Sequence, residues 1–282
     1  MDVRRMHAAL GLLVLALLLM TAGSVAAQPS KQQQQHQQVA GEPEGFWSQR
    51  IINVDAATIL PEHAIYAGAE ARFVFDDDNN QYYSGQVKGV PWDWLSLEAV
   101  ATLSKEKSIT TPWTTLCYGG DSYELRAKGR LYHNEKVCFS IMPGIEMSDT
   151  PAQHKQHATA QLLLTHYADA NTQLHFTPKW AFLHDNTIMG LGFGGEFRVH
   201  PKVRILGDIT PIVMGDNTRD EHGYLARTVV WAFGVRINPC LRHDDWLVDI
   251  SYGTGKGQTT SYELTPGIFH SKGVSVGACH VW

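Results

Sequence analysis

The sequence predicts an all-β fold, a single closed antiparallel transmembrane β-barrel of about twelve strands. Three observations predict it. Apolar and polar residues alternate along most of the chain, as in residues 121–132, where Glu124, Arg126, Lys128 and Arg130 share one face. A secretion signal precedes these segments, and the connections between them are alternately short and long. Because four charges on one face cannot line a dry core, that face should meet a polar lumen.

The chain begins with the layout of a cleavable signal peptide, residues 1–27. A basic start at Arg4 and Arg5 precedes an apolar run, which ends in small residues. Residues 28–60 are rich in glutamine, and we expect them to form a flexible periplasmic segment. Residues 61–282 should then form the outer-membrane barrel as one domain.

Composition argues against several other classes of protein. The net charge is −5 and charged residues make up 18% of the chain, so we expect no basic patch for nucleic acid. After the signal, the chain has no apolar run of the roughly 18 residues that a membrane helix needs. The acidic stretch at residues 76–80 lacks the spacing of an EF-hand, and no zinc motif is present. We therefore expect neither a metal nor a cofactor.

Period-2 alternation places the first six strands at residues 63–75, 82–88, 95–104, 121–132, 137–147 and 159–167. In the first strand, outward alanine and phenylalanine residues alternate with Glu70 and Arg72 on the inner face. The second strand carries Lys88 at an inner position, and the third reads L-S-L-E-A-V-A-T-L-S. The fifth alternates valine, phenylalanine and isoleucine with polar residues. Clusters of Gly, Asn, Asp, Pro and Lys separate the strands.

The last six strands are expected at residues 174–183, 188–199, 203–214, 227–237, 246–252 and 274–282. The first of these aligns four large apolar residues between Leu174 and Phe182. The next places Gly190, Gly192 and Gly194 on the inner side. Small inner residues are typical of a crowded wall or a strand bend.

The connections between these strands differ systematically in length. Short turns lie at residues 133–136, 171–172 and 200–202, whereas long loops lie at 105–120, 148–158, 215–226 and 254–273. Outer-membrane barrels have short turns on the periplasmic side and long loops outside. An even number of strands then places both termini on the periplasmic side.

The last ten residues alternate and end on an aromatic side chain. Val274, Val276, Ala278 and Trp282 should face lipid. This pattern resembles the C-terminal signal by which outer-membrane barrels are recognised for assembly. The resemblance implies two partners, outer-membrane lipid and the barrel assembly machinery.

From about residue 64 to 282 the chain resembles, in architecture alone, the porin-like outer-membrane barrels of Gram-negative bacteria with about twelve strands. The stretch Val90-Pro91-Trp92-Asp93-Trp94 takes the position of a short turn that repeats in such proteins. The resemblance implies localisation in the outer membrane after cleavage of the signal. Apart from the resemblance, a charged lumen makes small solutes possible partners, and the absence of a catalytic pairing leads us to expect no enzymatic activity.

Charges of both signs occupy the inner positions of the predicted strands. In a closed barrel they line the lumen: Glu70, Arg72, Lys88, Glu98, Glu124, Arg126, Lys128, Arg130, Glu146, Lys179, Glu196, Arg198, Arg204, Asp208, Arg236 and Asp249. Two interpretations remain open. The charges form either a slightly cation-rich pore wall that favours small anionic solutes, or a structural salt-bridge network in a nearly closed lumen.

Four cysteines in an exported chain permit disulfides. Cys240 lies in a predicted turn and Cys279 near the end of the last strand, both on the predicted periplasmic side. They can approach closely enough to form a disulfide, whereas Cys117 and Cys138 lie too far apart. Four reduced cysteines are the alternative.

The most favoured function from the sequence is a narrow passive channel or a structural barrel with a charged lumen. The alternative is a secreted or periplasmic β-sandwich that binds a ligand between its sheets. A less favoured alternative is a lipid-hydrolysing enzyme of the outer membrane. Hydrolysis would need a base beside an activated serine, and the chain lacks the H-x-S-N pairing of the twelve-stranded phospholipase. We therefore assign no catalytic residue.

Overall fold

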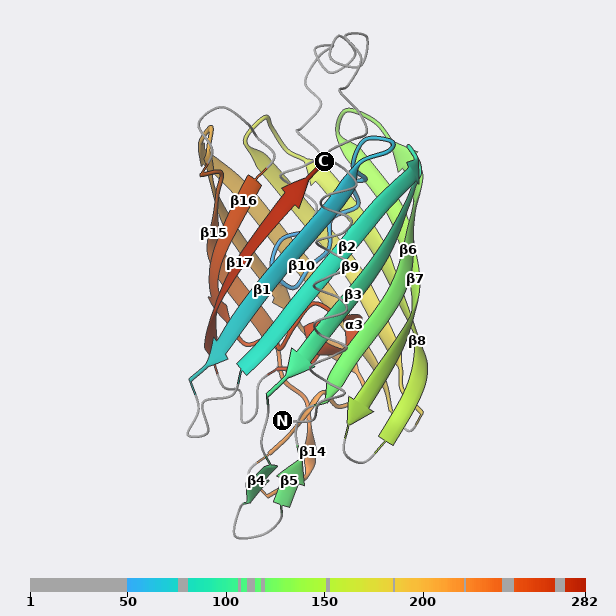
Figure 1. Cartoon of the computed structure of the whole chain (residues 1–282), viewed down its shortest axis with the longest axis vertical. Helices are drawn as coiled ribbons and strands as arrows, with labels where there is room; N and C mark the ends of the chain where they lie inside the picture. Colours follow the sequence, from blue (N-terminus) through green and yellow to red (C-terminus); the bar gives the residue numbers. More distant parts are fainter. Residues whose placement is uncertain are drawn as a thin grey trace.

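Twelve antiparallel strands close into a single barrel in a computed structural model of the chain (Figure 1). The structure describes residues 50–75, 81–105, 108–110, 115–117, 120–150, 153–184, 186–220, 222–239, 246–266 and 272–282. Each barrel strand pairs with its neighbours along the chain, and the pairing of β1 with β17 closes the barrel. The predicted fold class is confirmed. A β-sandwich has two separate sheets, so that alternative is wrong.

The barrel strands agree closely with the twelve that the alternation predicts. They are β1 (Ile65–Val74), β2 (Gln81–Trp92), β3 (Leu95–Ser104), β6 (Asp121–His133), β7 (Val137–Thr150), β8 (Gln153–Tyr167), β9 (Thr172–Phe182), β10 (Thr187–His200), β11 (Val203–Thr210) with β12 (Ile212–Met214), β15 (Val230–Ile237), β16 (Trp246–Gly253) and β17 (Gly273–Val281). The shorter elements are β4 (Ser108–Thr110), β5 (Thr115–Cys117), β13 (Thr218–Arg219), β14 (Leu225–Ala226) and α3 (Thr260–Glu263).

The ninth barrel strand is interrupted at Pro211, which separates β11 from β12. Both parts pair with β10, and the register shifts between Met189 and Gly190. Proline has no backbone N–H to donate to a strand ladder, but its carbonyl still accepts a bond of 3.0 Å from the Leu191 N–H. β11 and β12 are therefore one strand with a local irregularity.

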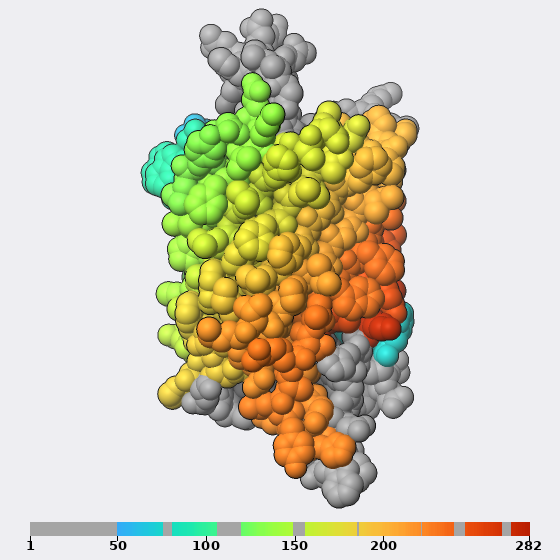
Figure 2. All heavy atoms as spheres, turned by 180° about the vertical axis from the view of Figure 1, so that it is seen from behind, coloured from blue at the N-terminus to red at the C-terminus, as the bar shows by residue number. Residues whose placement is uncertain are grey.

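The two ends of the barrel differ. Short connections join β2 to β3, β6 to β7, β8 to β9 and β10 to β11 at one end, the turn end. The C-terminus lies there too, because Trp282 and Ile65 exchange backbone hydrogen bonds of 2.9 and 3.2 Å. The hairpins β4–β5 and β13–β14 extend from the other end, the loop end (Figure 1). Figure 2 shows the region of β13–β14 in orange as a projection from this end.

Exposure alternates along the strands, as the sequence predicts for a barrel with apolar residues outside. In β6, Leu125 is 67% exposed, whereas its neighbours Glu124 and Arg126 are 1% and 4% exposed. The exposed apolar side chains include Leu97, Leu125, Ile145, Leu174, Phe193, Ile205, Phe233, Ile250 and Val276. Within the described residues, no helix has both the length and the apolar character to cross a membrane.

One of the four expected long loops is absent. Residues 148–158 do not form a loop, because β7 continues to Thr150 and β8 already begins at Gln153, with Ser148 opposite Lys155. The stretch contains few apolar residues, so the alternation predicts an earlier end of the strand than the structure shows. Backbone pairing does not require apolar side chains, so the hairpin extends beyond them.

Two segments that we expected outside the barrel wall lie inside the barrel. Residues 50–60, part of the expected flexible segment, are all buried, and so are most of residues 254–266, part of an expected external loop. The helix α3 belongs to the second segment and lies within the outline of the barrel (Figure 1). The fold therefore has a filled interior.

Candidate functional site: the filled lumen

The lumen contains two segments of the chain, which we call the N-terminal lumen segment, residues 50–60, and the loop lumen segment, residues 254–266. They contact each other. The Arg50 guanidinium lies 3.1 Å from the Glu263 carboxylate and donates to the Gln258 carbonyl at 3.5 Å. Residues from opposite ends of the sequence thus form one interior unit.

Apolar packing holds the N-terminal lumen segment against several strands. Ile51, Ile52 and Val54 cluster with Leu206 and Ala232 of β11 and β15. Farther along the segment, other residues pack in two further apolar clusters, on β7 and β8 and on β2. This apolar content explains why the segment is buried in spite of the glutamine tract that precedes it, since burying such side chains is favourable.

Hydrogen bonds fix the backbone of the same segment. Both oxygens of Asp208 accept bonds from Asn53, and one also accepts from the Ile52 N–H, at distances of 2.6–3.0 Å. Carbonyl oxygens of the segment accept from wall side chains, such as Lys128 Nζ on the Ala56 carbonyl at 3.0 Å and Ser140 Oγ on the Ala57 carbonyl at 2.6 Å. These bonds satisfy backbone groups that would otherwise be buried without partners.

A row of glycines in β10 makes room for both segments. A Cβ atom on Gly192 would lie 2.9 Å from Val54, and one on Gly194 would lie 3.2 Å from Ile51. At Gly190 the obstacle is Leu264, at 2.5 Å. The sequence indicated a crowded wall here, and the structure identifies the two lumen segments as what crowds it.

Wall carboxylates hold the loop lumen segment. Glu124 accepts from the Thr260 N–H at 2.8 Å and from its hydroxyl at 2.7 Å, and Glu146 accepts from the Ser261 N–H at 3.0 Å. The Lys179 ammonium donates to Glu263 at 2.8 Å. The start of α3 is thus bound to β6 and β7, and its end to β9.

A connected group of ionic side chains occupies the middle of the lumen, and we call it the central charge cluster. The wall contributes Lys88, Glu98, Glu124, Arg126, Lys128 and Lys179, and the lumen segments contribute Arg50, Asp55 and Glu263. Arg126 lies at its centre, 2.9 Å from Glu98, 3.4 Å from Asp55 and 3.6 Å from Glu124. All nine side chains are buried.

The pKa values of the two carboxylates in the lumen segments are shifted in opposite directions. Burial raises the pKa of Asp55, but the neighbouring Arg126 and Arg50 outweigh it and hold the pKa of this carboxyl well below its ordinary value. For Glu263, burial outweighs the attraction of Lys179 and raises the pKa above its ordinary value. The charge on Glu263 therefore depends strongly on its contacts with cations.

Most of the sixteen predicted lumen residues are buried: Arg72, Lys88, Glu98, Glu124, Arg126, Lys128, Glu146, Lys179, Glu196, Arg204, Asp208 and Arg236. The other four are half-buried: Glu70, Arg130, Arg198 and Asp249. Outside the central charge cluster, Arg204 pairs with Glu196, and Arg236 pairs with Asp249 at 2.7 Å. Arg130 instead pairs with Asp93 of the β2–β3 turn, at 3.4 Å.

Sequence reasoning missed Arg50, Asp55 and Glu263. None of them lies in an alternating stretch, so the period-2 pattern contains no information about them. A usable signal was the stretch from Ile51 to Leu60, in which seven of ten residues are apolar, a content that a disordered tether would not need.

The structure describes only one of the two cysteines of the predicted disulfide. Cys279 is buried in β17, and Cys240 lies outside the described residues, so the Cys240–Cys279 pairing remains a prediction.

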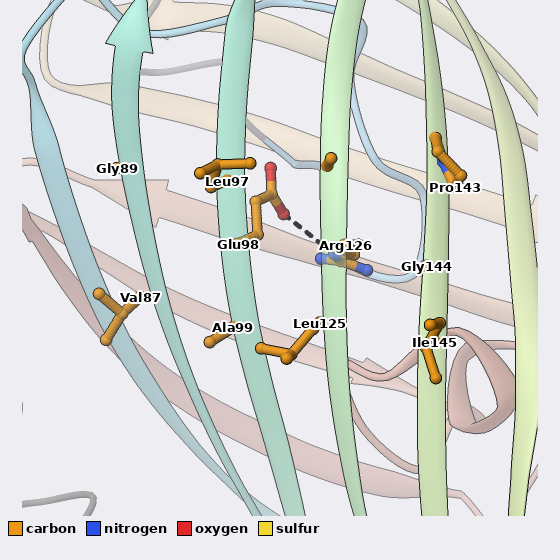
Figure 3. Close-up of a pocket in the computed structure, with 11 residues that line it drawn as sticks. Val87, Gly89, Leu97, Glu98, Ala99, Leu125, Arg126, Pro143, Gly144 and Ile145 are labelled. Atoms are coloured by element: carbon orange, nitrogen blue, oxygen red, sulfur yellow. Dashed lines mark hydrogen bonds and ion pairs between the residues drawn. The ribbon is translucent and has the colours of Figure 1, made fainter.

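A shallow groove lies on the outer wall over β2, β3, β6 and β7. Most of its lining is apolar and belongs to the outward positions of these strands, including Val87, Leu97, Leu125 and Ile145 (Figure 3). The Glu98–Arg126 ion pair lies between β3 and β6 in the same view. The groove is part of the apolar outer surface, and the polar chemistry lies inside the barrel.

Comparisons with known proteins agree with the architecture. No family model matches the chain, and no curated protein sequence matches it either. The chain is similar in structure to the NanC porin, with a TM-score of 0.55 and 6% identity over 76% of this chain and 98% of that one. The KdgM porin gives a TM-score of 0.51 at 8% identity, with the same coverage.

An outer membrane channel from Pseudomonas putida F1 gives a TM-score of 0.50 at 9% identity, over 79% of this chain and 97% of that one. At these identities the similarity concerns the fold alone, a closed antiparallel β-barrel of twelve strands.

Proposed function

We propose that the protein is an outer-membrane barrel that serves as a narrow passive channel for small solutes, through a charged lumen. The observation that carries this proposal is a closed barrel with an apolar exterior and buried charges of both signs inside. An apolar outer face has no place in a soluble barrel of this size but matches the requirement of a lipid bilayer. Cleavage after the signal at residues 1–27 would deliver residues 28–282 to the outer membrane.

Aromatic residues near both ends of the strands support the membrane location. Trp92 and Trp94 stack on each other at the turn end with ring centroids 5.8 Å apart, and both are about half exposed. Phe75 and Phe182 are exposed at the loop end. Such residues anchor a barrel at the two membrane–water interfaces. Outer-membrane lipid is therefore the first proposed partner.

The barrel assembly machinery is the second proposed partner, through β17. Val276 and Ala278 are exposed on the outer face of this strand, whereas Ser275 and Cys279 face inward. We propose that an assembly factor binds the outward-facing side chains of β17, which end near Trp282.

A passive role is proposed rather than an enzymatic one. Ser261 and His157 both contact the carboxylate of Glu146. The Ser261 hydroxyl donates a hydrogen bond to it, and the His157 imidazole lies 3.4 Å from it. Acyl transfer would instead need the histidine to accept the serine proton directly.

A purely structural barrel is the second candidate, because the two lumen segments fill the interior. The deciding experiment is planar-bilayer recording of the full chain, extracted from outer membranes and shown by heat-modifiable gel mobility to be folded. Discrete conductance steps support the channel. Folded protein that inserts but never conducts contradicts the channel and supports the structural barrel, and recovery as a soluble monomer without detergent contradicts both.

A further inference from the structure

We propose that the central charge cluster is a binding site for carboxylate anions, in which Asp55 and Glu263 act as the protein's own ligands. The proposal deepens the proposed channel function and rests on it for the role of the site, although binding itself can be measured without conduction. A solute carboxylate would take the place that these two side chains occupy when the lumen is filled.

The charges of the wall support this assignment. In the cluster, four wall cations, Lys88, Arg126, Lys128 and Lys179, face only two wall carboxylates, Glu98 and Glu124. The wall alone therefore has a surplus of two positive charges. The lumen segments bring the two missing carboxylates, together with one further cation. When the segments withdraw, the wall cations lose these two carboxylate partners, and anions from solution can take their place.

The geometry leaves donors available for a better-placed anion. Arg126 Nη1 lies 3.4 Å from Asp55 and 3.9 Å from Glu263, which is longer than the roughly 2.7–2.9 Å of a charge-assisted hydrogen bond. Neither Nη1 nor Nη2 of Arg126 makes a hydrogen bond to any residue that the structure describes, and the same holds for Lys88 Nζ. A planar guanidinium binds a free carboxylate with two parallel bonds, which the tethered Asp55 does not achieve.

The two internal carboxylates are coupled to each other. Asp55 belongs to the N-terminal lumen segment and Glu263 to the loop lumen segment, and Arg50 joins the segments through its 3.1 Å contact with Glu263. Lys179 holds both, because it donates to the Asn53 carbonyl and to Glu263. An anion that displaces Glu263 from Lys179 therefore also loosens the N-terminal lumen segment.

The test compares the full-length wild type with Asp55→Asn/Glu263→Gln, both folded in detergent. The probe is glucuronate, a small sugar carboxylate, and glucose at the same concentration is the neutral control. We expect glucuronate to raise the melting temperature of the double variant and to leave that of the wild type nearly unchanged, because the internal carboxylates already fill the wild-type site. The single variant Glu263→Gln, which keeps Asp55, should respond at an intermediate level and replaces the double variant if the latter fails to fold.

Conductance supplies the second readout. In a KCl gradient the double variant should have a reversal potential shifted toward that of chloride, and glucuronate should block its current at a concentration about tenfold lower than for the wild type. Asp93→Asn removes one exposed carboxylate outside the cluster and should behave as the wild type. Equal stabilisation of the variant by glucuronate and glucose overturns the site. Stabilisation by glucuronate alone, in a barrel that never conducts, supports the site and contradicts the channel.

Discussion

Glu98 is the single side chain on which most of the wall cations depend. Its carboxylate lies 2.9 Å from Arg126, 3.5 Å from Lys88 and 3.6 Å from Lys128, and it is buried. Removing one member of a buried ionic group leaves the others without compensation. At the rim, by contrast, Asp93 pairs with Arg130 while 71% of the Asp93 side chain is exposed.

Glu98→Gln should therefore lower the free energy of unfolding by about 3–5 kcal/mol. Asp93→Asn should change it by less than about 1 kcal/mol, because water screens an exposed pair. Both values follow from urea titration of the folded protein in detergent micelles. Equal effects of the two variants would mean that the central charge cluster is solvated and that its charges do not depend on one another.

These residues also mark the limit of sequence-based prediction. Alternation alone located Glu98, Arg126 and Lys179 on the inner wall, because a strand fixes the direction of every second side chain. No such rule applies to Asp55 or Glu263. Their positions depend on tertiary packing of irregular segments, so their role in the site could not be predicted from local pattern.

Cys279 of β17 is a buried cysteine whose predicted pairing can be tested directly. If it pairs with Cys240, peptide mapping under non-reducing conditions should recover the two cysteines in one linked fragment, which reduction separates. Recovery of unlinked peptides from folded, membrane-extracted protein would contradict the disulfide and support the alternative of reduced cysteines.

The strand β10 has glycines at the inward positions that contact the two lumen segments. Its inward positions are Gly190, Gly192 and Gly194, and the first and second leave less than 3.0 Å between an added Cβ and the lumen segments. Gly195 is different, because its added Cβ would meet Leu174 only at an ordinary contact distance of 3.5 Å. The glycine pattern was visible in the sequence, whereas the identity of its neighbours was not.

Gly192→Leu should expel the N-terminal lumen segment, because the added side chain occupies the space of Val54. Arg50 would then become accessible, and limited trypsin digestion should yield a new fragment that begins at Ile51. Gly195→Ala is the matched control and should give the wild-type digestion pattern. A folded Gly192→Leu barrel that remains protected at Arg50 would show that the segment does not need this space.

For the whole molecule, the proposed channel function raises the question of whether the N-terminal lumen segment must move before the lumen conducts. A native cysteine in the wall allows the N-terminal lumen segment to be cross-linked to the barrel. Cys138 of β7 is a buried free thiol that packs in one cluster with Ala57, and its sulfur lies 3.4 Å from the Ala57 carbonyl oxygen. A thiol introduced by Ala57→Cys would therefore lie in the same cluster as a native cysteine of the wall, close enough to test for a disulfide.

In oxidised Ala57→Cys, the segment is tied covalently to the wall. If solutes pass only when residues 50–60 withdraw, oxidation should reduce the open probability in planar bilayers at least about tenfold, and a reducing agent should restore it. Ala57→Ser cannot form the bond and controls for the substitution, while peptide mapping verifies the linkage between the introduced thiol and Cys138 through its mass. Unchanged conductance in the fully oxidised protein would mean that solutes pass beside a fixed segment, and the charges along that path, rather than displacement of the segment, would then set the selectivity.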